Sequence, residues 1–88
     1  MEAADFLGLY EAGYRNFKGI NLSGVDLSNQ ILVDIDLSAA NLTGANLSRT
    51  FLTKANLSGA QLTRATCAYA KLSKAQLNGA DLTKANQI

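Results

Sequence analysis

Leucine returns at every fifth position along most of this chain. Phe17 extends the series by one step toward the N-terminus, and Cys67 is the one position that breaks it. The leucines are Leu22, Leu27, Leu32, Leu37, Leu42, Leu47, Leu52, Leu57, Leu62, Leu72, Leu77 and Leu82. A period of five fits neither the period of about 3.6 of an α-helix nor the two-residue alternation of a strand. The same residue type must therefore meet the same surroundings once per repeat, which indicates a solenoid of short stacked units.

The residues around each leucine obey the same rule, so each quintet has five named positions. The alanine position stands two residues before the central leucine, and the Asx position, mostly Asn or Asp, stands directly before it. The hydroxyl position, nearly always Ser or Thr, follows the leucine, and the corner position completes the quintet. We expect leucine and alanine to point into a narrow core, which has room for one large and one small side chain per quintet. The other three positions face water, and Asn or Asp suits a frequent corner because it bonds to nearby amides.

This A-(D/N)-L-(S/T)-x pattern resembles the pentapeptide repeat family over about residues 15–86. The resemblance implies an all-β fold, a right-handed quadrilateral parallel β-helix in which four quintets close one coil. On that geometry residues 20 apart stack at about 4.8 Å, and the repeat region makes about three and a half coils.

The first residues of the chain depart from the five-residue pattern. Several of them recur instead at helical spacing: Phe6, Leu9, Tyr10 and Gly13. We predict a helix over residues 3–12 that ends at Gly13 as its C-terminal cap. Residues 1–14 then form a capping helix on a repeat domain of residues 15–88, because the end of a solenoid exposes apolar surface and strand edges. This segment also resembles the N-terminal segment of small cyanobacterial members of the family.

The chain offers little material for enzyme chemistry. It has no histidine, no paired Cys/His spacing for a metal and no glycine-rich phosphate loop, so we expect no catalytic, cofactor-binding or metal-binding residues. Cys67 occupies a leucine slot, where we expect a small buried hydrophobe rather than a reactive thiol. A single cysteine also excludes an internal disulfide.

The N-terminal segment does not resemble a targeting signal. Acidic Glu2 and Asp5 stand where a signal peptide carries basic residues. No stretch approaches the roughly 20 apolar residues that span a bilayer. We therefore expect a cytoplasmic protein without a membrane partner.

One wall of the expected coil is abnormal. Ile31 and Phe51 occupy the Asx position, Val33 lies outward beside them, and Lys71 comes next in the same column. Either these residues simply cover part of a wall, or Ile31, Val33 and Phe51 form a contact patch for an unidentified protein partner. On the neighbouring column Arg49 and Tyr69 should stack. Gln30 and Thr50 stand at the inward alanine position, where each needs a hydrogen-bond partner, either the other residue or a trapped water.

The charges divide the chain into an acidic and a basic half. Residues 1–44 carry a formal charge of −4 and residues 45–88 one of +5, for a total of +1. Some family members mimic DNA and modulate DNA gyrase and related topoisomerases, but such mimicry needs a long, strongly negative rod, so charge and length disfavour it here. Direct nucleic-acid binding by the basic half is disfavoured by the lack of aromatic stacking platforms there.

The leading hypothesis is a non-catalytic structural scaffold or protein-interaction module of unknown biological role. The last coil shows no sign of a capping helix, so it could self-associate with a second molecule. The alternative for this end is that residues 85–88 fray.

Overall fold

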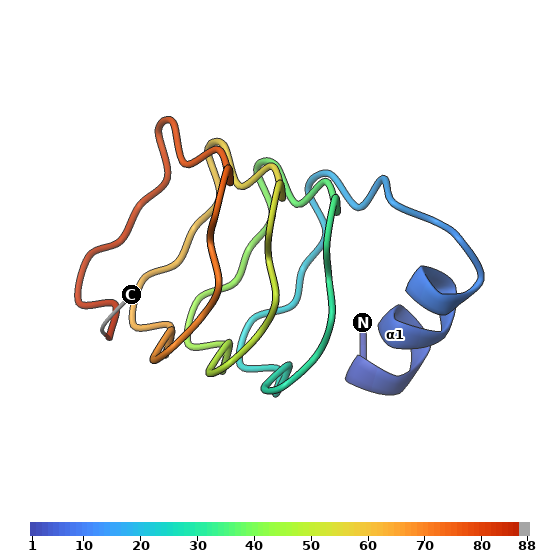
Figure 1. Ribbon diagram of the computed structural model, residues 1–88. Helices are drawn as coiled ribbons and strands as arrows, with labels where there is room; N and C mark the ends of the chain where they lie inside the picture. The colour runs from blue at the N-terminus through green and yellow to red at the C-terminus, as the bar shows by residue number, and fades with distance from the viewer. Residues whose placement is uncertain (87–88) are drawn as a thin grey trace.

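The computed structural model describes residues 1–86 as a stack of coils closed at its N-terminal end by one helix (Figure 1). The helix, α1, spans Ala3–Glu11, one residue less than the predicted range. The repeat begins immediately after it, and its corners line up in rows along the stack. Among the described residues, no helix is long and apolar enough to cross a membrane.

Adjacent coils are joined by parallel backbone pairing at a constant offset. Each pairing links two residues 20 apart, as in the column of Asn16, Asp36, Asn56 and Gln76. Four quintets therefore make one coil. Within residues 1–86 these pairings are isolated single-residue bridges. The predicted parallel pairing between coils is therefore present, but the described residues form no continuous strands. The reason is the corner in every quintet, which leaves too few extended residues between corners for a strand to continue.

Each corner is a hydrogen-bonded turn. The N–H at the alanine position donates to the central carbonyl of the preceding quintet, as Ala45 N does to Leu42 O at 3.0 Å. The corner position between them has a positive φ, which together with this bond defines a type II turn. Glycine fills some of these positions, but nine other residues adopt φ of 58–65° there, among them Ala39. Such residues bear a steric cost that glycine does not.

The Asx position braces the next turn. The Oδ1 atom of Asn41 accepts a hydrogen bond from the N–H of Thr43 at 3.1 Å, and most other Asn and Asp residues at this position do the same. Asp36 accepts from both the hydroxyl (2.6 Å) and the N–H (2.9 Å) of Ser38, and these bonds lower the pKa of its carboxyl group. The local Asn/Asp and Ser/Thr pattern therefore follows from satisfying amides at the corner.

The core is a column of leucine faced by alanine, as predicted. The central residues from Leu22 to Leu62 are all buried, and so are most alanines of the middle coils. Burial weakens toward the C-terminal end, where Leu72 and Leu77 are half-buried and Leu82 is 38% exposed. This gradient follows because no further coil of the described residues covers them.

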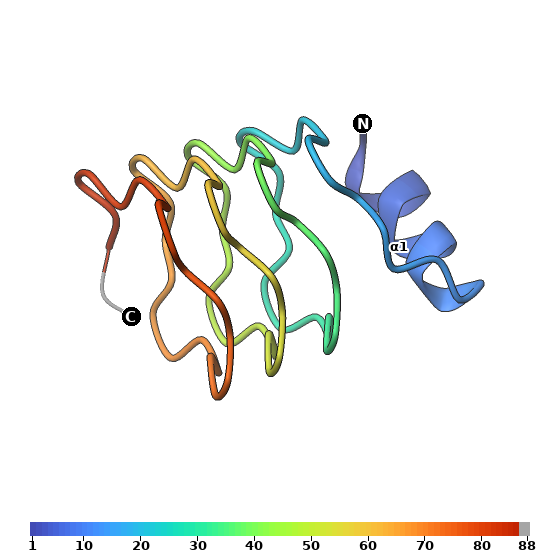
Figure 2. The same ribbon diagram turned by 90° about the horizontal axis from the view of Figure 1, so that it is seen from above.

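The helix α1 closes the other end of the core. Phe6 is fully buried, and its ring meets the Phe17 ring edge-on with centroids 4.8 Å apart. Gly13 takes a φ of +105°, and the bonds from Gly13 N to Tyr10 O and from Tyr14 N to Leu9 O complete a Schellman cap. The predicted glycine cap is therefore confirmed. Figure 2 shows the helix at the opposite end of the stack from the last coil, drawn in red.

Two substitutions in one column test the left-handed corner. Ala39 and Gly59 occupy the same corner on adjacent coils with φ of +58° and +69°. We expect Ala39→Gly to raise the free energy of unfolding, and Gly59→Ala to lower it, by roughly 0.5–1 kcal/mol each. A methyl group on Gly59 would stand 3.9 Å from the Ala39 nitrogen, an ordinary contact, so the change isolates backbone strain.

Urea unfolding of both variants is the measurement. Gly8→Ala is the control, since Gly8 lies inside α1 with open space around it and alanine should stabilise a helix there. Equal and same-signed changes for Gly8→Ala and Gly59→Ala would contradict the assignment of strain to the corner.

Candidate protein-contact surface

The abnormal wall carries one continuous column of outward side chains. Ile31 pairs with Phe51, and Phe51 pairs with Lys71, on three successive coils. The Ile31 side chain is 63% exposed and the Phe51 side chain 42% exposed. The structure thus brings both apolar residues together on the surface, in the order that the twenty-residue offset predicts.

This column lacks the turn brace that Asn and Asp provide in most other quintets. Ile31 and Phe51 stand where Asn or Asp would accept a hydrogen bond from the N–H two residues later. An apolar side chain has no acceptor, so the N–H groups of Val33 and Thr53 lose that partner. The two residues are therefore not explained by the local stability of the turn.

Val33 lies differently from the other two members of the predicted patch. Its side chain is half-buried, and its carbonyl accepts a hydrogen bond from the hydroxyl of Tyr10 in α1 at 2.8 Å. Arg15 lies over the Tyr10 ring at 3.7 Å and donates to the Tyr10 carbonyl at 2.8 Å. The helix is thus anchored beside the patch, and a hollow of about 330 Å³ between Tyr10 and Ile31 continues the surface onto α1.

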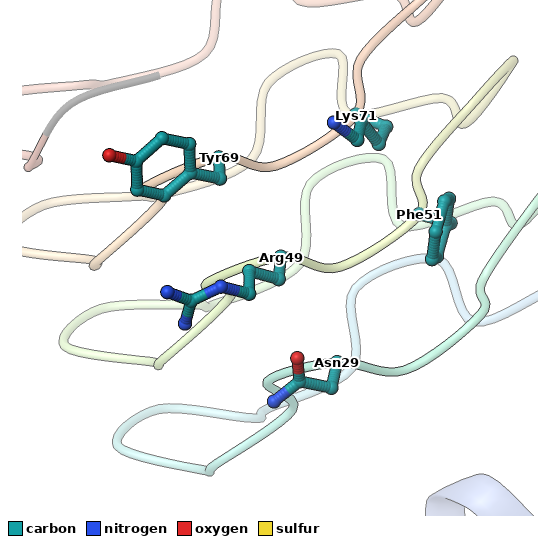
Figure 3. Close-up of a pocket in the computed structure, with 5 residues that line it drawn as sticks. All are labelled: Asn29, Arg49, Phe51, Tyr69 and Lys71. Carbon is teal, nitrogen blue, oxygen red and sulfur yellow. The ribbon is translucent and has the colours of Figure 1, made fainter.

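A second column runs along the adjacent corner, two residues before the first. Asn29, Arg49 and Tyr69 occupy it on successive coils, all with left-handed backbone. The Arg49 guanidinium carbon lies 5.5 Å from the centroid of the Tyr69 ring, which confirms the predicted stacking (Figure 3). With Phe51 and Lys71 these residues line a hollow of about 390 Å³, here named the corner groove. Sequence reasoning named its members separately but did not identify the groove.

The inward polar residues of this wall are satisfied locally. Thr50 is fully buried, and its hydroxyl donates to the Leu27 carbonyl at 2.9 Å. Gln30 is half-buried, with its amide nitrogen 3.5 Å from the Ser28 carbonyl. The two side chains do not bond each other: Gln30 reaches a carbonyl of the preceding quintet, and Thr50 reaches a carbonyl of the preceding coil. Among the described residues no buried side-chain polar atom lacks a partner.

The described residues present no metal cluster, and Cys67 is buried. No group of three His, Cys, Asp or Glu side chains lies close enough to hold a metal ion in the described part of the chain. Cys67 is 3% exposed, and burial raises the pKa of its thiol, which disfavours the reactive thiolate. Cys67 is thus the small buried hydrophobe that its slot predicts.

Solved structures of similar chains were found among cyanobacterial proteins. A pentapeptide repeat protein from Nostoc Pcc 7120 is 38% identical with a TM-score of 0.56, and the match covers 96% of this chain and 74% of that one. A pentapeptide repeat protein from Cyanothece 51142 is 33% identical with a TM-score of 0.54, covering 83% of this chain and 57% of that one.

HetL from Nostoc sp. strain PCC 7120, a pentapeptide repeat protein involved in heterocyst differentiation regulation, is 41% identical with a TM-score of 0.52. The match covers 97% of this chain and 38% of HetL, so this chain spans well under half the length of that protein. No protein with a curated description gave a significant match.

The model of the pentapeptide repeat family matches residues 20–59 and 60–86. This range covers the described quintets except the first, residues 15–19, which already pairs with the next coil through Asn16. Most of the twenty-residue ladder, all the buried leucines and most of the corner turns lie within the same range. The chain therefore belongs to the pentapeptide repeat family.

Proposed function

We propose that this chain is a non-catalytic interaction module that binds a protein partner through Ile31, Val33 and Phe51. The observation that carries the proposal is the exposure of Ile31 and Phe51 at a position where every other described quintet places a polar residue. An apolar residue there loses a hydrogen bond and exposes carbon to water, and a partner that covers it would offset both costs. We also infer that the coils wind in a right-handed sense, as the family resemblance implies.

The rigidity of the wall favours binding. Phe51 and Ile31 are held in register by backbone bonds on both sides, such as Phe51 N to Gln30 O at 2.8 Å and Leu32 N to Phe51 O at 2.7 Å. A partner therefore meets a surface that is already ordered, so that little conformational entropy is lost on association. The role printed for HetL, in the regulation of differentiation, is consistent with action through binding.

Phe51→Asn tests the patch without adding charge. Asparagine is the commonest residue at the Asx position, and a residue such as Asn56 accepts a bond from the N–H two residues later, so the variant should fold at least as well. If Phe51 anchors the partner, we expect about 30-fold weaker retention in an affinity capture from native cells, the usual effect of losing an aromatic hot spot.

The matched control is Gln61→Asn, which introduces the same residue, asparagine, at an exposed Asx position on the opposite wall. We expect this variant to retain all partners that the unchanged protein captures. If Phe51→Asn also retains all of them, the patch is not the contact surface.

We also propose that a second copy of this chain covers the C-terminal coil. Leu82 is exposed there beside half-buried Leu77, and their N–H groups, which on earlier coils donate to the next coil, find no acceptor among residues 1–86. Of the segment expected to fray, residues 85–86 join the ladder through Asn86 N and Ala65 O at 2.7 Å, and residues 87–88 lie outside the described part.

Sedimentation at several concentrations should show a dimer that Leu82→Asp dissociates. A monomer at every concentration would exclude this self-association.

A further inference from the structure

We propose that the corner groove binds carboxylate side chains of an extended segment, so that the protein partner of this wall is acidic. This inference rests on the proposed function, because it assigns the chemistry of the partner that Ile31 and Phe51 contact. The groove adjoins the patch directly, since Phe51 belongs to both.

This wall carries more basic than acidic side chains. Residues 37–80 contain no Asp or Glu, and they carry five basic residues. Arg64 lies on another wall. The other four lie at the two corners or on the face of the wall that the quintets 50–54 and 70–74 form: Arg49, Lys54, Lys71 and Lys74. Asp34 stands in the same corner column as Lys54 and Lys74, but no carboxylate lines the groove itself. The excess of cations therefore attracts an acidic partner and disfavours a basic one.

The groove alternates cationic and aromatic side chains. Arg49 and Phe51 lie two residues apart on one coil, and Tyr69 and Lys71 lie above them on the next. Stacking on Tyr69 restricts the Arg49 side chain, so less entropy is lost when its planar donors bind a carboxylate. In an extended peptide alternate side chains share one face, with roughly 6–7 Å between them. A segment that alternates acidic and apolar residues can therefore present a carboxylate to Arg49 and an apolar group to Phe51.

The same residues fit a single-stranded nucleic acid less well. Binding of that kind uses aromatic rings with free faces on which successive bases stack. Arg49 covers one face of Tyr69, and the column beside it continues from Phe51 to the aliphatic Ile31 rather than to another ring. The aromatic surface that is present therefore suits apolar side chains of a peptide.

The test titrates the ¹⁵N-labelled protein with a peptide of alternating Glu and Phe or Leu, a matched peptide with Gln for every Glu, and an oligothymidylate of similar length. We expect saturable amide shifts at Arg49, Phe51, Tyr69 and Lys71 with the Glu peptide, weakened by added salt. Binding of the Gln peptide should be about tenfold weaker or worse, as expected from the loss of two charge contacts. Equal binding of the two peptides, no shifts with the Glu peptide, or tighter binding of the oligothymidylate would each overturn the proposal.

Matched variants test whether binding of the Glu peptide depends on the groove residues Arg49 and Lys71. Asn29 occupies the same corner as Arg49 with the same backbone, so Arg49→Asn should fold, and Lys71→Asn restores the usual Asx residue. We expect the double variant Arg49→Asn/Lys71→Asn to bind the Glu peptide about tenfold more weakly. The control Arg64→Asn removes a charge from a corner with the same φ of +59° on another wall, and should change binding less than twofold. An equal loss in Arg64→Asn would show general charge attraction and overturn the assignment to the groove.

The affinity capture separates this inference from the function on which it rests. If Phe51→Asn loses the partner while the double variant keeps it, the contact surface stands and the acidic partner is wrong. If Phe51→Asn keeps every partner, the contact surface itself is wrong, whatever the peptide titration gives.

Discussion

The whole structure depends on one hydrogen-bonded turn that closes every quintet. Its bond, from the N–H of the alanine position to the preceding leucine carbonyl, fixes a left-handed residue at each corner. That corner sends leucine and alanine inward and the other three side chains outward. Four such corners return the chain to its starting direction one coil later, where the backbone pairs with residues 20 earlier. Core, ladder and walls therefore all follow from the turn.

Because the repeat is regular, the position of a residue that departs from its pattern is known. A side chain at the Asx position is outward and stacked on its neighbours whatever its chemistry, so replacing the polar residue by Ile31 or Phe51 exposes an apolar column without disturbing the fold. The same geometry places Arg49 against Tyr69 and both beside Phe51 and Lys71. In this chain the outward residues can thus be changed one column at a time, while the core remains constant.

Sequence alone predicted what depends on the period. The buried leucines, the slot of Cys67 and the Arg49–Tyr69 stacking follow from counting in fives and twenties, and the glycine cap follows from the helical spacing before the repeat. It failed where three-dimensional detail decides. Thr50 bonds to a carbonyl 23 residues earlier rather than to Gln30, and single-residue bridges replace strands because corners interrupt them. The corner groove combines two columns of different phase, which no single period reveals.

Hydrogen exchange of the backbone amides tests the turn and the twenty-residue ladder together. In the quintet 40–44 four amides bond to backbone carbonyls, whereas the amide of Thr43 bonds only to the Asn41 side chain. The account predicts that exchange is fastest at the hydroxyl position and slow at the other four, with a period of five through the middle coils. Protection that alternates every second residue, as in a half-exposed strand, or that lacks a five-residue period would contradict it.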